Sequence, residues 1–235
     1  MRLHRFYLNT PISGKTFDVT DRDLIHQWRS VFRYNVGSQV ILFDGTGTDY
    51  LCIISSLRNL GATLTVLEKT LKKNDHNHGK NIWICLGIIK KDNFELVVQK
   101  VTELGVAHIV PVLCERSEKK NIKLDRLQKI AIEASEQSNR GDIPYIHNIV
   151  EFSSLLKGDL LPNRVVFLDT RGKSFKEALK NENPNELAIF VGPEGGWSDA
   201  EVKEFAKHNI PSISLGSQIL RAETAAIAVS SLLLL

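Results

Sequence analysis

The stretch Phe190-Val191-Gly192-Pro193-Glu194-Gly195-Gly196-Trp197-Ser198 joins an apolar segment to the start of a helix. Its three glycines allow a tight loop and a close approach of the backbone to a ligand. Ser198 and Glu201 have the spacing of a capping box, which opens the next helix. Ligands of open α/β sheets bind outside the carboxyl ends of strands, so this loop is a candidate binding site. A glycine-rich turn without a ligand would have the same composition.

Strands and helices alternate on both sides of this loop. Apolar segments that predict strands lie at 82–89, 108–113, 164–168, 187–191 and 213–215. Patterns that predict helices lie at 93–104, 124–138, 175–180, 199–208 and from 222 onward. Continuous apolar strands separated by helices predict a parallel sheet with helices on both faces. We therefore expect an α/β domain over residues 81–235.

The first third of the chain has a different pattern. Short alternating segments predict strands at 4–8, 15–19, 39–43, 50–54 and 62–67. One amphipathic helix interrupts them, with Thr20 as its expected cap and Gly37 at its end. We expect a small β-barrel over residues 1–72, followed by a polar linker at 73–80.

The formal net charge of +3 lies entirely in residues 1–72, which hold nine basic and six acidic residues. This excess suits contact with phosphate, although a solvated surface would have the same charge. Two histidines of the linker, His76 and His78, are weak evidence for a metal, and we expect no metal site.

Composition excludes several classes of protein. With 43% hydrophobic and 24% charged residues, the 235-residue chain is neither collagen, coiled coil nor disordered. The apolar stretch 225–235 is too short for a membrane helix, and the first residues do not resemble a secretory signal. Cys52, Cys85 and Cys114 are far apart and odd in number, so we expect reduced, buried thiols in a cytoplasmic protein.

A second candidate site follows the strand at 213–215. Gly216 permits a turn, apolar side chains follow it, and Arg221, Glu223 and Thr224 add polar groups at a helix start. An apolar wall with a few polar groups is typical of a small-molecule pocket, although Arg221 and Glu223 could instead only pair with each other. The motifs of P-loop and dinucleotide-binding proteins are absent from the sequence, which disfavours nucleotide hydrolysis.

A third segment, 132–141, places Glu133, Gln137 and Arg140 on one side of a helix. Together with Arg116, these residues predict a polar and partly basic rim. A solvated helix face would have the same pattern.

Taken together, these segments resemble the RsmE-type ribosomal RNA uridine-N3 methyltransferases of the SPOUT superfamily. The resemblance rests on segments 190–196, 215–225, 102–106, 116–117 and 133–140. His4-Arg5-Phe6-Tyr7 and Val31-Phe32-Arg33 before Gly37 resemble the PUA-like RNA-binding barrel of the same family. Family members commonly have Arg where this chain has Gln218 and Thr where it has Ala222.

The resemblance implies an α/β SPOUT methyltransferase domain with a trefoil knot at 81–235, behind a PUA-like β-barrel at 1–72. It further implies a homodimer that uses S-adenosylmethionine to methylate N3 of a uridine in 16S ribosomal RNA, either naked or in the assembled small subunit. Two alternatives stay open: a non-catalytic RNA-binding ribosome-assembly factor, and a SPOUT methyltransferase with a different RNA target.

The resemblance also implies roles for individual residues. The expected catalytic residues are Arg221, Glu194 and Glu223. The expected cofactor-binding residues are Leu168, Val191, Gly192, Pro193, Gly195, Leu215, Gly216, Ile219, Leu220, Thr224 and Ala225. The expected RNA-binding residues are Arg5, His26, Arg33, Arg116, Gln137 and Arg140.

Overall fold

The computed structural model describes residues 3–72, 79–117, 122–178 and 184–235. Contacts divide the chain into two compact units, one made of 1–74 with 135–142 and the other of 75–134 with 143–235. The break between 74 and 75 lies within the segment predicted as a linker. Most of that segment, including His76 and His78, lies outside the described residues. Residues 135–142, which we expected in the second domain, group with the first unit.

The first unit contains a five-stranded sheet. Its strands, in spatial order, are β1 (Arg5–Tyr7), β3 (Gln39–Phe43), β4 (Thr48–Arg58), β5 (Gly61–Leu71) and β2 (Thr16–Val19). β1 and β3 are parallel, and the other pairs are antiparallel. We expected a barrel; the described strands pair as an open path with β1 and β2 at its ends.

One helical segment packs on this sheet. Helix α1 (Arg22–His26) continues directly into a π-helical turn, η1 (Gln27–Val31). Its cap is Asp21 rather than the expected Thr20, because the Asp21 carboxylate accepts the backbone N–H groups of Asp23 and Leu24. The unit's core gathers Trp28 of η1 with alternate residues of the strands, among them Leu42, Ile54 and Leu64.

The second unit contains a seven-stranded sheet in which every pair is parallel, as the sequence predicted. The strand order is β12 (Ser212–Ser214), β10 (Val165–Ser174), β11 (Glu186–Val191), β6 (Asn81–Gly87), β7 (His108–Leu113) and β8 (Tyr145–Ile146). The seventh strand, β9 (Val150–Glu151), pairs with β7. β8 and β9 were not predicted, and β10 continues six residues beyond the predicted end at Leu168.

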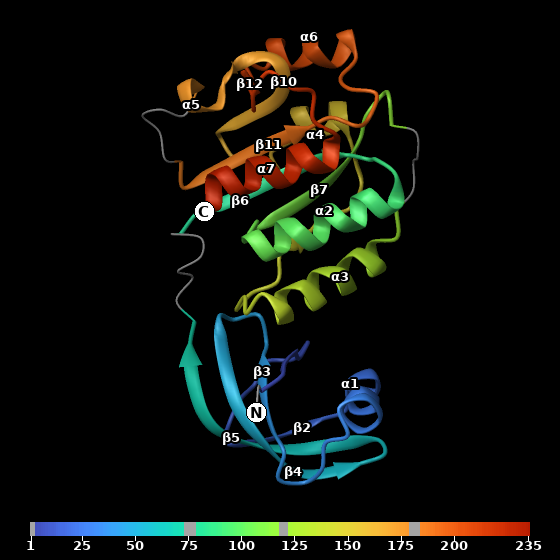
Figure 1. Ribbon diagram of the computed structural model, residues 1–235, viewed down its shortest axis with the longest axis vertical. Helices are drawn as coiled ribbons and strands as arrows, with labels where there is room; N and C mark the ends of the chain where they lie inside the picture. The colour runs from blue at the N-terminus through green and yellow to red at the C-terminus, as the bar shows by residue number, and fades with distance from the viewer. Residues whose placement is uncertain (1–2, 73–78, 118–121, 179–183) are drawn as a thin grey trace. The chain divides into compact units, whose positions relative to one another are not determined.

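Helices cover both faces of this sheet. They are α2 (Lys91–Leu104), α3 (Leu124–Gln137), α4 (Phe152–Lys157), α5 (Phe175–Ala178), α6 (Asp199–Lys207) and α7 (Ala222–Leu234). On one face, α2 and α7 lie side by side and pack on Leu187, Ile189 and Val191 of β11 (Figure 1). On the other face, Phe190 packs with Phe205 of α6 and the apolar side of α4. The α/β prediction is therefore confirmed, with α4 as an unpredicted addition.

None of the described helices combines the length and the apolar character that crossing a bilayer requires. The three cysteines are free and buried, as expected. Burial raises the pKa of the Cys52 thiol to about 12, so this side chain behaves as a small apolar residue.

Candidate active site

A cavity of about 780 Å³ lies in the second unit, at the carboxyl ends of β6, β11 and β12 and beside the middle of β10. Parallel strands bring their carboxyl ends to one edge of the sheet, which is where α/β domains bind ligands. The expected cofactor-binding residues all line the cavity except Gly195 and Thr224. All three expected catalytic residues, Arg221, Glu194 and Glu223, line it as well.

The glycine-rich loop after β11 forms one wall. The N–H of Gly196 donates to the carbonyl of Pro193 (2.8 Å) and closes a tight turn. The Glu194 carboxylate accepts the backbone N–H of Lys90 (3.0 Å), which joins the loop to the start of α2. A Cβ atom at Gly87 would lie 2.7 Å from Cδ of Pro193. The loop therefore packs directly on the end of β6, where a larger residue than glycine would displace it.

The side chains of Arg116 and Trp197 hold the same loop in place. Arg116 Nη1 donates to the carbonyls of Gly195 (3.0 Å) and Trp197 (3.2 Å). The Trp197 indole N–H donates to the carbonyl of Leu168 on β10 (2.9 Å). Arg116, which we expected to bind RNA, is thus bonded to the cavity wall by one nitrogen, and its side chain stays exposed.

The loop after β12 forms another part of the cavity wall. The Ser214 hydroxyl donates to the carbonyl of Gly216 (2.9 Å) and accepts its N–H (3.3 Å), which holds the turn. Ile219 is 89% exposed at the cavity edge, with Leu220 beside it. Large apolar side chains left exposed at a cavity provide a surface for an apolar part of a ligand.

The start of α7 brings an arginine and a carboxylate into the cavity. The Arg221 side chain is 86% exposed, whereas that of Glu223 is 10% exposed, and 4.0 Å separate Arg221 Nη1 from Glu223 Oε1. The second oxygen, Glu223 Oε2, is buried and has no hydrogen-bond partner in the structure. A buried carboxylate oxygen without a partner is costly, so this atom indicates a position prepared for a donor or a cation.

Some cavity residues were not predicted. They are Asn93, Asp169, Thr170 and Arg171. Arg171 donates from Nε and Nη2 to the two carboxylate oxygens of Asp169 (3.0 and 2.9 Å). This pairing lowers the pKa of Asp169 below its usual range. The signal that would have found the last three is their position directly after the apolar stretch that ends at Leu168.

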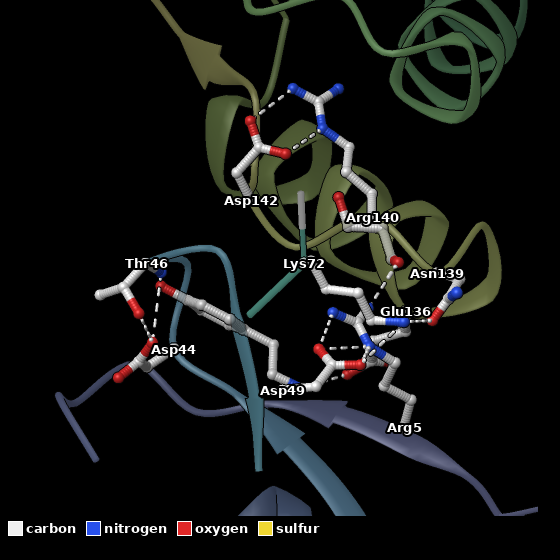
Figure 2. Close-up of polar contacts among 11 residues, drawn as sticks. Arg5, Asp44, Thr46, Asp49, Lys72, Glu136, Asn139, Arg140 and Asp142 are labelled. Carbon is white, nitrogen blue, oxygen red and sulfur yellow. Dashed lines mark hydrogen bonds and ion pairs between the residues drawn. The ribbon is translucent and has the colours of Figure 1, made fainter. Parts of the chain in front are cut away.

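Two of the expected RNA-binding arginines are buried in the first unit. Figure 2 shows Arg5 beside Asp49, with the closest nitrogen and oxygen 2.6 Å apart, and Arg140 beside Asp142 at 2.7 Å. Arg5 is 8% exposed and Arg140 7% exposed. Arg5 also donates to the carbonyl of Ser135 (3.1 Å). Both cations are engaged within the protein, which favours a structural role and leaves their contact with RNA a prediction.

The other expected RNA-binding residues of the first unit, His26, Arg33 and Gln137, are exposed. Arg33 follows η1 closely and has a left-handed backbone, with φ of 54°. A non-glycine residue in this region is uncommon and is frequently found at functional positions.

In the part of the chain that the structure describes, no three His, Cys, Asp or Glu side chains gather as a metal site would require.

Comparisons with known proteins agree with this architecture. Residues 76–234 match the family model described as the RNA methyltransferase domain, and residues 29–67 match the RNA methyltransferase PUA domain. Ribosomal RNA small subunit methyltransferase E of Rickettsia conorii is 30% identical over 232 residues, covering 97% of this chain and 93% of that protein. The chain belongs to the ribosomal RNA small subunit methyltransferase E family.

Further relatives and solved structures match along most of the chain. The Bacillus subtilis protein is 31% identical and covers 89% of this chain and 86% of its own length. The crystal structure of the Neisseria gonorrhoeae protein bound to S-adenosyl methionine has a TM-score of 0.88, 28% identity, and coverage of 98% of this chain and 96% of its own. A Legionella pneumophila methyltransferase in complex with the same cofactor has a TM-score of 0.87 at 27% identity, covering 99% of this chain and 97% of its own. The predicted fold, a SPOUT α/β domain with a PUA-like domain, is confirmed.

Proposed function

We propose that this protein methylates N3 of a uridine in small-subunit ribosomal RNA and that the cavity of the second unit is its active site. As a member of the methyltransferase E family, the chain is an S-adenosylmethionine-dependent ribosomal RNA methyltransferase. The position of the uridine N3 as the acceptor is our proposal. One cavity is lined by both predicted loops and by Glu223, whose buried Oε2 atom has no hydrogen-bond partner. This observation supports the assignment of the site.

The residues of the cavity suit S-adenosylmethionine. Its volume of about 780 Å³ lies within the range of small-molecule sites. Leu168, Leu215 and Leu220 provide apolar walls for an adenosine group, and the glycine-rich loop lets backbone groups approach the ligand. The buried Glu223 carboxylate complements the positive charges of the cofactor. When bound, this cofactor supplies an electrophilic methyl group on a positively charged sulfur.

Side chains at the start of α7 or in the glycine-rich loop have to remove a proton from the uracil and stabilise the anion that forms. Its N3 carries a proton that must leave, and the resulting anion needs a positive charge nearby. We assign the stabilisation of that anion to Arg221, because its side chain is exposed at the cavity. Glu223 is the better candidate for the base, because Glu194 already accepts a hydrogen bond from Lys90.

Two matched variants test the choice of base. Glu223→Gln should lower kcat by about 10²- to 10⁴-fold, the usual contribution of a positioned base, and Glu194→Gln should have a smaller effect. The cofactor affinity of each variant, measured by calorimetry, separates loss of the base from loss of cofactor binding. If only Glu194→Gln lowers kcat, the two assignments must be exchanged.

We assign RNA contacts to the exposed residues His26, Arg33 and Gln137, with Arg116 beside the cavity wall. Because Arg5 and Arg140 are buried in ion pairs, they are expected to hold the first unit together rather than to touch RNA.

We also propose that the protein acts as a homodimer in the cytoplasm, where ribosomal subunits are assembled. Leu232 of α7, which is 56% exposed, suits a dimer contact. Light scattering on the wild type and on Leu232→Glu tests the dimer.

The decisive measurement combines the purified protein, labelled S-adenosylmethionine and small ribosomal subunits from a strain that lacks the modification. Nuclease digestion and mass spectrometry then identify the labelled nucleoside. Recovery of 3-methyluridine supports the proposal. Label in another nucleoside contradicts the assignment of N3, and absence of label on any RNA favours the alternative of a non-catalytic assembly factor.

A further inference from the structure

Strand β10 has an irregular segment, residues 169–172, beside the cavity. Leu168 and Lys173 are both paired with Ile213 of β12, so residues 169–172 stand outside the ladder between them. A Cβ atom at Gly172 would lie 2.7 Å from backbone atoms of Ser212 and Ile213. At Gly172, this irregular segment therefore packs tightly against the backbone of β12. It places Asp169, Thr170 and Arg171 on the cavity wall.

Arg171 is oriented by its neighbour. Asp169 accepts three hydrogen bonds from it, from Nε (3.0 Å), from Nη2 (2.9 Å) and from the backbone N–H (2.8 Å). The Asp169 side chain is 11% exposed and that of Arg171 is 76% exposed. A guanidinium has five N–H donors in a fixed plane. Asp169 takes the edge formed by Nε and Nη2, so the end formed by Nη1 and the second Nη2 hydrogen is left to solvent.

The same arrangement recurs across the cavity. At the start of α7, the Glu223 side chain is 10% exposed and that of Arg221 is 86% exposed, much as those of Asp169 and Arg171 are 11% and 76% exposed. Lys90 adds a third exposed cation to the lining, against one exposed carboxylate, Glu194. Asp169 and Glu223 are thus largely covered, whereas three cations and one carboxylate are exposed at the cavity. A cationic cofactor suits the covered carboxylates, and a polyanion suits the exposed cations.

We propose that Arg171 binds a phosphodiester group of the RNA next to the target nucleotide, with Asp169 as its positioning residue. This inference rests on the proposed function of the cavity. The free end of the guanidinium matches two oxygens of a phosphate, the planar two-point geometry in which arginine binds this group best. A carboxylate of the cofactor would need one cation, whereas three exposed cations in the cavity lining suit successive phosphates of a strand.

The test measures binding and methyl transfer separately on the full chain. Arg171→Gln should weaken binding to unmodified small subunits roughly tenfold at low salt. It should also reduce the slope of log affinity against log salt by about 0.7 to 0.9, the value for one lost phosphate contact. KM for subunits should rise and kcat should change little. The affinity for S-adenosylmethionine, measured by calorimetry without RNA, should stay within about twofold of the wild type.

Two further variants sharpen the test. Arg126→Gln removes an exposed cation of α3 outside the cavity and should leave subunit affinity and salt slope unchanged. Asp169→Asn keeps the positive charge of Arg171 but loses its orientation. This variant should lower subunit affinity while the salt slope stays near that of the wild type, a combination that a purely structural defect would not produce.

The outcomes are distinguishable. If Arg171→Gln weakens cofactor binding and leaves subunit binding intact, the arginine serves the cofactor and the proposal is overturned. If neither changes, or if Arg126→Gln has the same effect, it is overturned as well. If the wild type labels a nucleoside other than uridine at N3, the proposed function fails, whereas the salt slope of Arg171→Gln still tests the phosphate contact.

Discussion

At position 172 the chain has no room for a side chain. A Cβ atom there would lie 2.7 Å from the backbone of Ser212 and Ile213, and backbone atoms do not move aside as the end of a flexible side chain does. We predict that Gly172→Ala lowers the free energy of unfolding by about 1 to 3 kcal/mol, the usual cost of overpacking. Urea unfolding measures this change. Lys173→Ala, which alters the exposed neighbouring side chain, should have little effect, and equal midpoints for both variants would contradict the prediction.

Residue type alone could not separate the arginines of this chain by role. The sequence predicted both Arg221 and Arg5 as site residues, but only Arg221 lines the cavity with an exposed side chain. Arg5 is buried because Asp49, 44 positions away, lies beside it. Arg171 was overlooked although its partner Asp169 is only two positions away. An ion-pair partner that is distant in the chain leaves no sign in a local sequence pattern. A partner two positions away can be found by inspecting the polar residues directly after each predicted strand.

At the scale of elements, the capping box of α6 shows which contacts a local pattern predicts. Ser198 accepts the N–H of Glu201 (3.2 Å), and the Glu201 carboxylate accepts the N–H of Ser198 (2.8 Å), as the spacing predicted. The other oxygen of Glu201 accepts the N–H of Glu115 (2.9 Å), 86 positions away, which the sequence did not indicate. The helix start therefore also holds the segment after β7.

This double use of one carboxylate leads to a prediction. Ser198→Ala should destabilise the protein by about 1 kcal/mol, as loss of a helix cap usually does. Glu201→Ala should destabilise it more, because it leaves the buried N–H of Ser198 and also the N–H of Glu115 without this partner. Chemical denaturation of the two variants compares these costs. Equal costs would mean that the bond to Glu115 contributes nothing.

His108 at the start of β7 and His147, which follows β8, lie close together beside Trp83 of β6. His108 stacks on Trp83 with ring centres 3.7 Å apart, and its Nδ1 lies 3.1 Å from Nε2 of His147. Burial, followed by the proximity of His147, lowers the pKa of His108 to about 4. The unfolded chain has an ordinary histidine pKa near 6.5, so it binds more protons than the folded protein between these values.

The stability of the second unit should therefore decrease as the pH falls from about 6.5 towards 4. Above this window both states are neutral at His108, and this residue adds no pH dependence. Urea unfolding at a series of pH values measures the slope. His108→Gln, which cannot gain a proton, should reduce it, and an unchanged slope would show that other groups cause the acid sensitivity.

The sequence predicted long elements better than short ones. Strands such as β11 and helices such as α2 have enough residues to show a period, and both were predicted at nearly their observed positions. β8 and β9 have two residues each and α4 has six, too few for a period to be visible. Their positions depend on pairing with β7 and packing below the sheet, which are tertiary contacts.

At the scale of the whole molecule, the two units have separate cores, and the described residues that line the cavity all belong to the second unit. We predict that Asp49→Ala, which leaves the Arg5 cation buried without its carboxylate, lowers stability by about 3 to 5 kcal/mol. The affinity for S-adenosylmethionine should remain unchanged in the folded variant. Calorimetric titration and urea unfolding test the two statements.

A double variant provides the control. Arg5→Met combined with Asp49→Leu removes both charges and should be less destabilising than Asp49→Ala alone, because no buried charge is left unpaired. If the double variant is the less stable of the two, the packing of these side chains matters more than their charges. A loss of cofactor affinity in Asp49→Ala would contradict the independence of the cavity from the first unit.

The grouping of residues 135–142 with the first unit also bears on the order of events during synthesis. The last strand of that unit ends at Leu71, but the carbonyl of Ser135 and the side chain of Asn139 complete the contacts of Arg5 and Lys72. When residues 1–71 have emerged from the ribosome, the growing chain therefore still lacks residues that the first unit needs for these contacts. Synthesis must reach residue 142, inside the segment that matches the RNA methyltransferase domain, before the PUA-like domain attains its final state.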